Sequence, residues 1–266
     1  MKIAIIGTGN LGHSIAMGLI NTNAITTLYL TKRKLDSLQK FGGYKNVTIT
    51  SNNVLAVQES DILIFAVQPA HFEDVLKEVT PFLTENHVLI STVTGFEINR
   101  IEIVVGENQF VVRAMPNTAI AVGKSMTCLC SNTLGEKRIK VAESIFNRLG
   151  HSLCIPESQM QAATVVCASG IAFWMRLIRA TTQAAIQLGF DAKEAQELAM
   201  YTSEGAANLL ITNGDHPEQE IDRVTTPKGC TIEGLNEMEH KGLSSSLIQG
   251  MVASFNKIST IKKEQL

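Results

Sequence analysis

The sequence lacks a strong excess of either charge and is poor in aromatic side chains. Its 266 residues carry a formal net charge of -2, and only 5% of them are aromatic. A nucleic-acid-binding surface is basic, and a single-stranded ligand also needs aromatic rings on which its bases stack. We therefore expect no nucleic-acid partner.

The sequence also lacks a CxxC pair. Its five cysteines, at positions 128, 130, 154, 167 and 230, are scattered along the chain. An odd number of scattered cysteines favours free thiols in a reducing cytoplasm over a disulfide framework. Cys128 and Cys130 share one face of a predicted strand and are expected to be core thiols, and no metal site is predicted because partners at ligand spacing are missing.

A long uncharged run occurs once and needs a membrane test. No charged residue lies among the 18 residues from Ser158 to Met175. Polar side chains dilute this run, and Arg176 and Arg179 follow it at once. These features favour a helix buried inside protein over a membrane span, so no membrane partner is expected.

A glycine pattern near the N-terminus follows a short apolar strand at Lys2–Ile6 and opens a helix. This context gives the pattern G-x-G-x-x-G its meaning as a dinucleotide-binding turn. The glycines permit the tight turn, the close approach of a pyrophosphate and the packing of helix on sheet. The residues expected at the cofactor are Gly7, Thr8, Gly9, Asn10, Leu11 and Gly12. The alternative is an α/β turn without a ligand.

The end of the second predicted strand, at 27–30, carries cations instead of an acid. Domains that prefer NAD place a carboxylate there for the ribose 2′-hydroxyl. This sequence has Thr31, Lys32, Arg33 and Lys34, which suit a 2′-phosphate. We therefore predict that NADP(H) is preferred over NAD(H), with Thr31, Lys32 and Arg33 at the phosphate. The alternative is a solvated run of charge at the start of a helix.

Further apolar runs alternate with helical segments as far as residue 156. The runs lie at 61–67, 87–92, 109–117, 125–130 and 151–155, with a helix predicted at 135–149. This alternation predicts an α/β fold, a Rossmann-type, mostly parallel, doubly wound sheet over residues 1–156. Ligands of such sheets lie beyond the carboxyl ends of the strands. The loops at 7–12, 31–34, 67–69, 93–95 and 115–118 are therefore expected to line one cleft.

The sequence predicts an all-α domain over residues 157–266. A helix at 158–188 is apolar on every side, which indicates the centre of a bundle. Another helix is capped by Asp191 and ends at Asn213-Gly214, and further helices are predicted from Pro217, at 231–240 and at 243–262. Since one chain of this size cannot easily cover the helix at 158–188, we predict an obligate homodimer that buries it.

The order of these motifs resembles one known family across nearly the whole chain. The segments "AVQP" at 66–69, "VVRAMPNT" at 111–118 and "DRVTTPKGCTIEGL" at 222–235 are similar to those of the Δ1-pyrroline-5-carboxylate reductases. The pattern from Pro227 to Leu235 is the most specific of them. The resemblance implies NAD(P)H-dependent reduction of the cyclic imine of 1-pyrroline-5-carboxylate to L-proline, the last step of proline biosynthesis. From the free thiols and the apolar helix, the chain is expected to be a cytoplasmic homodimer, and a larger ring of dimers is left open.

The resemblance also implies roles for individual residues. Thr231 matches a threonine whose hydroxyl lies near the imine nitrogen, and is the expected catalytic residue. Its alternative role is that of an ordinary helix N-cap. The expected substrate-binding residues are Thr226, Gly229, Cys230 and Thr231. The further cofactor residues are Asn53, Val67, Gln68, Pro69, Gly95, Met115, Pro116 and Asn117.

The chain departs from the family pattern at several positions. Gln68 stands where lysine is usual, Val93-Thr94 where two alanines are usual, and Lys228 where glycine is usual. Ile171 replaces a proline, which removes an expected helix kink. These departures leave open the shape of the pocket wall and the role of Lys228.

Two other functions compete with this interpretation. The first is another NADP-dependent imine or hydroxyacid reductase. Hydroxyacid enzymes of this architecture commonly carry a catalytic lysine on the long helix, and the helix at 158–188 has none. The second is a non-enzymatic NADP-binding sensor, which would have no need of a carboxylate-binding loop.

Overall fold

The computed structural model describes residues 1–22 and 25–264, and they form two compact units. Residues 1–169 and the chain from Phe255 onwards make up the first unit, and residues 170–254 make up the second. The sequence-based boundary after residue 156 stays a prediction. In the structure, residues 157–169 have their contacts within the first unit.

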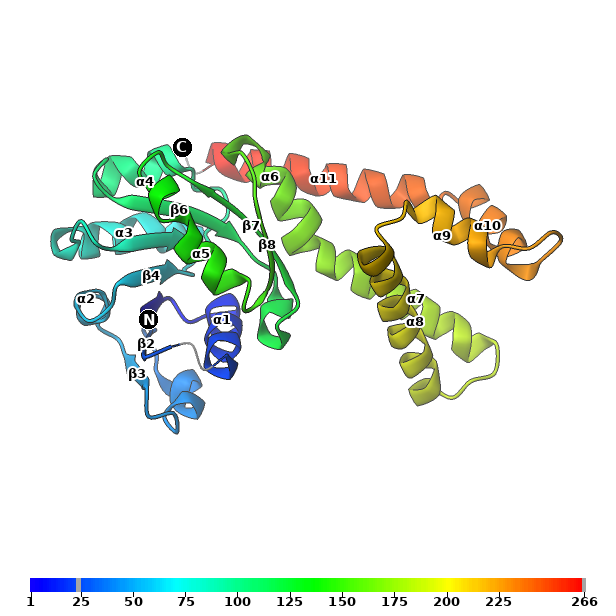
Figure 1. Cartoon of the computed structure of the whole chain (residues 1–266), viewed down its shortest axis with the longest axis horizontal. Helices are drawn as coiled ribbons and strands as arrows, with labels where there is room; N and C mark the ends of the chain where they lie inside the picture. Colours follow the sequence, from blue (N-terminus) through cyan, green and yellow to red (C-terminus); the bar gives the residue numbers. More distant parts are fainter. Residues whose placement is uncertain (23–24, 265–266) are drawn as a thin grey trace. The chain divides into compact units, whose positions relative to one another are not determined.

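The first unit contains a doubly wound sheet of eight strands within the described residues (Figure 1). Their order is β3-β2-β1-β4-β5-β6-β7-β8, and every neighbouring pair is parallel except β6 with β7. The predicted Rossmann-type, mostly parallel sheet is therefore confirmed. The strands are β1 (Lys2–Ile6), β2 (Thr27–Thr31), β3 (Val47–Thr50), β4 (Ile62–Phe65), β5 (Val88–Ser91), β6 (Phe110–Met115), β7 (Ser125–Ser131) and β8 (Gly150–Cys154).

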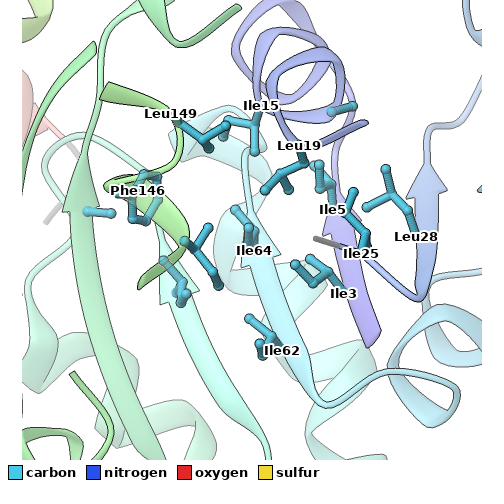
Figure 2. Close-up of a cluster of buried hydrophobic side chains, with 14 of the residues drawn as sticks. Ile3, Ile5, Ile15, Leu19, Ile25, Leu28, Ile62, Ile64, Phe146 and Leu149 are labelled. Atoms are coloured by element: carbon cyan, nitrogen blue, oxygen red, sulfur yellow. The ribbon is translucent and has the colours of Figure 1, made fainter. Parts of the chain in front are cut away.

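Two hydrophobic layers cover the faces of this sheet. Along β1, Ile3 and Ile5 belong to one buried cluster and Ala4 and Ile6 to the other, as the two-residue period of a strand requires. Helices α1 (Asn10–Asn21) and α5 (Ile139–Phe146) contribute to the first cluster, which Figure 2 shows. Helices α2 (Asn53–Gln58), α3 (Pro69–Val79) and α4 (Ile98–Val105) contribute to the second. Each such aliphatic side chain stabilises the fold by about 1.5–3 kcal/mol through burial.

Short helical turns complete the first unit. They are η1 (Asp36–Phe41), η2 (Thr80–Phe82), η3 (Thr118–Val122), η4 (Gly135–Lys137) and η5 (Glu157–Gln159). The predicted helix at 135–149 is thus η4 followed by α5, which ends at Phe146. Neither β3 nor α2 was predicted, because each is short and β3 has side chains that are only partly buried.

The C-terminal part of the chain is helical, as predicted. It consists of α6 (Met160–Ala163), the π-helical turn η6 (Thr164–Ser169), α7 (Gly170–Gln187), α8 (Ala192–Asn213), α9 (Pro217–Val224), α10 (Cys230–His240) and α11 (Leu243–Glu264). The helix predicted at 158–188 is therefore interrupted by a π-helical turn. That turn ends two residues before Ile171, so an irregularity remains in this segment although the proline is missing.

The predicted ends of α8 are confirmed. The Asp191 carboxylate accepts hydrogen bonds from the backbone N–H groups of Lys193 and Glu194, at 2.8 and 2.9 Å. At the other end, Gly214 adopts the left-handed conformation with φ 70°, where glycine avoids the cost of a Cβ atom. Short-range signals therefore set both ends of this helix.

The long apolar helix is not buried within one chain. The segment Glu157–Gln187 is long and apolar enough to cross a membrane, and 22% of its most apolar window is buried. Trp174 on α7 is 61% exposed and Ile211 on α8 is 79% exposed. The single chain therefore leaves this helix largely uncovered, and its burial at the centre of a bundle of two subunits stays a prediction. Partner protein remains the predicted cover for these side chains.

Candidate active site

The three glycines of the turn after β1 have different surroundings. Gly7 has φ 90°, and a Cβ atom there would lie 2.4 Å from Val67 Cγ1. A Cβ atom on Gly12 would lie 2.7 Å from the carbonyl oxygen of Gly7. A Cβ atom on Gly9 would meet no protein atom within 4 Å. The fold therefore needs glycine at 7 and 12, whereas the space above Gly9 is left for a ligand.

The turn leads directly into the N-terminus of α1. Gly9 is the N-cap residue, and no side chain caps the helix. The first N–H groups of a helix have no partner within it and, with the helix dipole, attract phosphate. Thr8 is 1% exposed, and its Oγ1 lacks a hydrogen-bond partner. An open backbone, free N–H groups and an uncapped helix fit the pyrophosphate of a dinucleotide.

A cleft opens beside this turn at the carboxyl ends of β1, β4 and β5. The residues that line it are Gly9, Asn10, Leu11, Ala66, Val67, Gln68, Pro69, Thr92, Val93 and Thr94. The structure thus brings together six of the predicted cofactor residues from the turn at 7–12 and the loop at 67–69. Ala66 and Thr92 were not predicted to line the cleft, because each lies in an apolar run that was predicted to be a strand.

Thr31 braces the glycine turn. Its side chain is 1% exposed, and its Oγ1 accepts a hydrogen bond from the N–H of Gly7 at 3.2 Å. Its carbonyl oxygen accepts a second one from the N–H of Thr8 at 2.8 Å. These bonds fix β2 to the turn. Of the predicted phosphate residues, Lys32 donates to Ser37 Oγ at 2.7 Å and Arg33 is exposed.

Two histidines that were not assigned to the site lie near these cations. His71, in the first turn of α3, has its Nε2 3.5 Å from an Arg33 guanidinium nitrogen. His13 on α1 packs on the ring of Phe41, with ring centroids 5.0 Å apart. Burial lowers the pKa of His13, and the charges of Lys40 and Lys32 lower it further. The end of β2 is therefore a region of positive potential.

Asn53, the predicted ribose contact, is the first residue of α2. Its Nδ2 donates a hydrogen bond to Glu78 Oε2 on α3 at 2.9 Å. The preceding residue, Asn52, caps α2 by accepting from the N–H of Leu55 at 3.0 Å. Asn53 is thus held toward α3, and it does not line the cleft described above.

The predicted nicotinamide residues Met115, Pro116 and Asn117 lie at the end of β6. Asn117 donates its backbone N–H to Ser125 Oγ at 3.1 Å and its side-chain Nδ2 to the carbonyl of Cys167, also at 3.1 Å. Its Oδ1 accepts from the N–H of Ala119 at 3.0 Å. Asn117 therefore fixes the loop after β6 to both β7 and the π-helical turn. Gly95, the other predicted residue here, has φ 80°.

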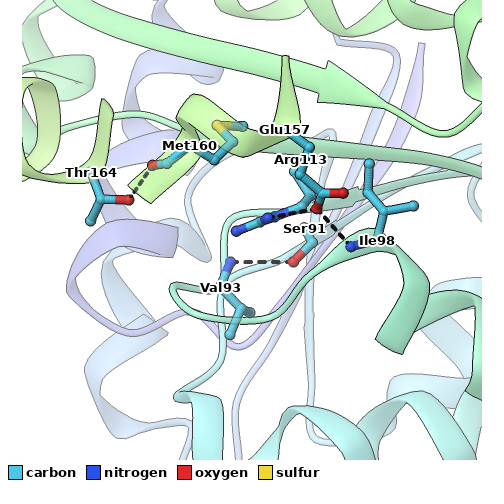
Figure 3. A network of polar contacts seen from close by, with 7 residues as sticks. All are labelled: Ser91, Val93, Ile98, Arg113, Glu157, Met160 and Thr164. Carbon is cyan, nitrogen blue, oxygen red and sulfur yellow. Dashed lines mark hydrogen bonds and ion pairs between the residues drawn. The ribbon is translucent and has the colours of Figure 1, made fainter. Parts of the chain in front are cut away.

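An ion pair anchors the chain just before α6. The Arg113 guanidinium on β6 is 5% exposed and lies 2.7 Å from Glu157 Oε1. The same carboxylate oxygen accepts from the N–H of Ile98 at 2.8 Å (Figure 3). The Glu157 carboxylate thus links the start of the helical segment both to β6, through Arg113, and to the start of α4, through Ile98.

The predicted substrate loop is a tight turn between α9 and α10. The N–H of Gly229 donates to the carbonyl of Thr226 at 2.9 Å, with Pro227 and Lys228 at the central positions. Lys228 has φ 61°, the only positive φ outside glycine among the described residues. Proline followed by a residue of positive φ is the type II pattern, which favours glycine at the second position. The exposed Lys228 thus occupies that position at a cost of about 1–2 kcal/mol.

Gly229 is needed for space beside Thr226 and not for its backbone conformation. Its φ is -77°, so the tight turn does not depend on glycine there. A Cβ atom on Gly229 would instead lie 2.5 Å from Thr226 Oγ1. Its N–H is engaged in the turn. The free N–H groups that enter α10 are therefore those of Cys230 and Thr231.

Thr231 does not cap α10. The N-cap residue is Gly229, and no side chain caps this helix. The Thr231 side chain is exposed, in the first turn of the helix. The alternative explanation of Thr231 as an ordinary N-cap is therefore wrong. An uncapped N-terminus beside an exposed hydroxyl can bind a carboxylate and donate a hydrogen bond to a neighbouring nitrogen.

Comparisons with known proteins agree with these two halves. Residues 157–261 match the family model "Pyrroline-5-carboxylate reductase dimerisation", and residues 2–95 match "NADP oxidoreductase coenzyme F420-dependent". Pyrroline-5-carboxylate reductase 2 of Dictyostelium discoideum is 40% identical over 97% of this chain and 92% of that protein. Pyrroline-5-carboxylate reductase 1 of the same organism is 42% identical, and the chain spans 49% of its length.

Solved structures of pyrroline carboxylate reductases also superpose on nearly the whole chain. The pyrroline carboxylate reductase of Plasmodium falciparum, determined with NADP bound, superposes with a TM-score of 0.89 at 25% identity, over 98% of each chain. The enzyme of Coxiella burnetii superposes with a TM-score of 0.88 at 29% identity, over 97% of each chain. The chain, an NAD(P)-binding Rossmann domain joined to a helical dimerisation domain, belongs to the pyrroline-5-carboxylate reductase family.

Proposed function

We propose that this chain catalyses the NAD(P)H-dependent reduction of 1-pyrroline-5-carboxylate to L-proline. The observation that carries the proposal is the turn at Thr226–Gly229, which feeds the uncapped N-terminus of α10. The glycine turn after β1 requires only a dinucleotide. The second anion site, beside the Thr231 hydroxyl, suits a small substrate that carries one carboxylate close to a nitrogen.

The chemistry needs positioning more than it needs a strong acid. A bound nicotinamide would supply a hydride to the carbon of the C=N bond, and the nitrogen would keep or gain a proton. A protonated imine is the better electrophile. The N–H groups of Cys230 and Thr231 would hold the carboxylate, while the Thr231 hydroxyl would hydrogen-bond the nitrogen. Thr226 and Gly229 would shape the loop.

The direct test is oxidation of NADPH by the purified chain in the presence of 1-pyrroline-5-carboxylate. We expect turnover with this imine and formation of proline. The matched control is a 2- or 3-hydroxyacid assayed in the reverse direction with NADP⁺, which a hydroxyacid dehydrogenase would oxidise. Turnover of the hydroxyacid alone would contradict the proposal. Binding of NADPH without turnover of either substrate would favour the alternative function, a non-enzymatic NADP-binding sensor.

NADPH is the proposed cofactor in preference to NADH. Arg33 is exposed beside His71, and Lys32 lies next to it in the same loop after β2. An arginine presents several donors to phosphate oxygens in a fixed geometry. The buried Thr31 braces this loop from below, so the cations stand at a defined position relative to the glycine turn.

Arg33→Ala is expected to lower kcat/KM for NADPH about tenfold or more and to leave kcat/KM for NADH nearly unchanged. Loss of one charge-assisted hydrogen bond of about 1.5–3 kcal/mol accounts for this size. Steady-state kinetics with both cofactors measure it. Lys45→Ala removes an exposed cation in a loop outside the cleft and serves as the control. An equal loss of kcat/KM with both cofactors would show that Arg33 does not contact the 2′-phosphate.

A homodimer is the proposed assembly, and a ring of dimers stays a prediction. Within the helical unit, large apolar side chains lie exposed on α7, on α8 and in the turn between them, among them Trp174 (61%), Leu188 (81%), Tyr201 (70%) and Ile211 (79%). Monomeric soluble proteins rarely expose contiguous apolar surface of this kind. The match of residues 157–261 to a dimerisation domain supports a second copy as the cover. Burial in that interface would cover the apolar helix with protein, and a cytoplasmic location stays a prediction.

Trp174→Glu is expected to shift the chain from dimer to monomer at micromolar concentration. A buried tryptophan is a frequent anchor of an interface, and a carboxylate in its place would be desolvated without a partner. Light scattering after size-exclusion chromatography measures the mass. Glu197→Gln on α8 changes an exposed carboxylate and is the control. A wild-type chain that is a stable, folded monomer would refute the assembly.

A further inference from the structure

Two cysteine thiols from distant parts of the sequence meet in the first unit. Cys128 on β7 and Cys167 in the π-helical turn have their Sγ atoms 3.8 Å apart. Cys128 is 4% exposed, whereas Cys167 is only half-buried. In the single chain, the Cys167 residue is therefore partly exposed, and Cys128 lies beside it within the core.

We propose that Cys128 and Cys167 form an oxidisable dithiol, a modification site at which a small peroxide produces a reversible disulfide. Three observations combine in this assignment: the contact between the sulfur atoms, the partial exposure of Cys167, and the burial of Cys128 beside it. The site makes no use of the residues assigned to hydride transfer.

Within the pair, Cys167 is the thiol that ionises more readily. A hydrogen bond from Cys128 lowers the pKa of Cys167 to about 7, although partial burial opposes the shift. The same hydrogen bond, together with burial, raises the pKa of Cys128. Since thiolates are the nucleophiles in cysteine chemistry, Cys167 would attack and Cys128 would resolve.

The reaction balances with peroxide as the only oxidant. The Cys167 thiolate attacks one peroxide oxygen, the O–O bond breaks, and Cys167 becomes a sulfenic acid as hydroxide leaves. Cys128 then attacks that sulfur and expels the second oxygen, while its proton passes to the leaving hydroxide. Overall, two thiols and one hydrogen peroxide give one disulfide and two waters. Loss of the Cys167 charge in the first step removes the main cause that keeps Cys128 protonated.

Both cysteines adjoin the predicted nicotinamide segment. Cys128 is the register partner of Met115 in the antiparallel pairing of β6 and β7. The carbonyl oxygen of Cys167 accepts the hydrogen bond from Asn117 Nδ2. A disulfide has its sulfur atoms about 2.05 Å apart. Bond formation therefore requires the sulfur atoms, now 3.8 Å apart, to move together, and this movement would displace the Cys167 backbone that accepts the hydrogen bond from Asn117.

The test is peptide mapping of the purified full chain after treatment with hydrogen peroxide. We expect a linked peptide pair containing residues 128 and 167, lighter by two hydrogen atoms, which a dithiol reductant separates. Cys167→Ser should abolish the linked pair. Cys230→Ser, which changes an exposed cysteine at the substrate loop, should leave it intact. Free Cys128 and Cys167 in a sample whose exposed cysteines are oxidised would overturn the proposal.

The consequence for turnover rests on the proposed function, whereas the mass measurement does not. Oxidised wild type should turn over the imine about tenfold more slowly or worse, because displacement by about 1 Å can cost that much or more. Reduction should restore the rate, and oxidised Cys167→Ser should keep it. A linked peptide pair with unchanged turnover would overturn the coupling to Asn117. No turnover in the reduced chain would instead count against the proposed function alone.

Discussion

Gly9→Val is expected to weaken NADPH binding by about 100-fold or more, while the chain still folds. Such a loss corresponds to about 2.7 kcal/mol of binding free energy. The physical reason is that the Gly9 Cβ position is empty of protein atoms to 4 Å, at the N-terminus of α1. The valine side chain would occupy the space that the pyrophosphate needs. Fluorescence titration with NADPH measures the dissociation constant, and thermal unfolding measures Tm.

Substitutions at two other glycines separate an effect on NADPH binding from an effect on stability. Valine is a poor N-cap, so Gly9→Val should lower stability by about 1 kcal/mol, a Tm change of about 2–4 °C. Gly12→Val should cost far more stability, because even its Cβ atom would lie 2.7 Å from the carbonyl of Gly7. Gly43→Val, at an open position with no positive φ, is the matched control and should bind NADPH normally. Normal binding by Gly9→Val would mean that the cofactor does not use this turn.

Thr231→Val is expected to lower kcat/KM for 1-pyrroline-5-carboxylate by about 100-fold, with little change in Tm. Groups that assist proton placement in a transition state contribute about 10²–10⁴-fold. Valine keeps the shape of the side chain and removes only the hydroxyl. Stability should hold because the exposed Thr231 side chain does not cap α10, whose N-cap residue is Gly229. Steady-state kinetics and thermal unfolding on the same preparations separate the two effects.

Thr231→Ser restores the hydroxyl and should recover most of the rate. A second comparison comes from Thr226→Val. In the wild type, Thr226 Oγ1 lies near the position that a Cβ atom on Gly229 would occupy. This variant should change the shape of the loop and therefore act mainly on KM. If Thr231→Val and Thr231→Ser are equally active, the hydroxyl has no part in the reaction. Equal losses of activity and Tm would indicate a structural role.

Local sequence signals account for much of the fold. Continuous apolar runs such as Ile62–Phe65, bounded by turn signals, favour central strands of a parallel sheet, and they were placed to within a few residues. The turn after β1 was recognisable because a strand precedes the glycines and a helix follows them. The strand β3 was missed, since its four residues are partly exposed at the sheet edge and have no distinctive period.

The details of the site depend on contacts that no local pattern encodes. The Thr31 hydroxyl was predicted at the phosphate, but it accepts a hydrogen bond from the N–H of Gly7, 24 residues away in sequence. His71 approaches Arg33 only because α3 begins at the same edge of the sheet as the loop after β2. The positive φ of Lys228 could be inferred from its place after Pro227, whereas the contact of Gly229 with Thr226 could not.

Deuterium transfer tests the central claim most directly. The chain is supplied with NADPH deuterated at the hydride-donating face of C4 and with 1-pyrroline-5-carboxylate, and the product is examined by mass spectrometry and NMR. We predict L-proline carrying one deuterium on the ring carbon that is bonded to nitrogen and does not bear the carboxylate. Deuterated proline should form more slowly when Gly9→Val replaces the wild type at an NADPH concentration below the dissociation constant of the variant. Consumption of NADPH without deuterated proline, or no consumption at all, would contradict the assignment of this chain as an imine reductase.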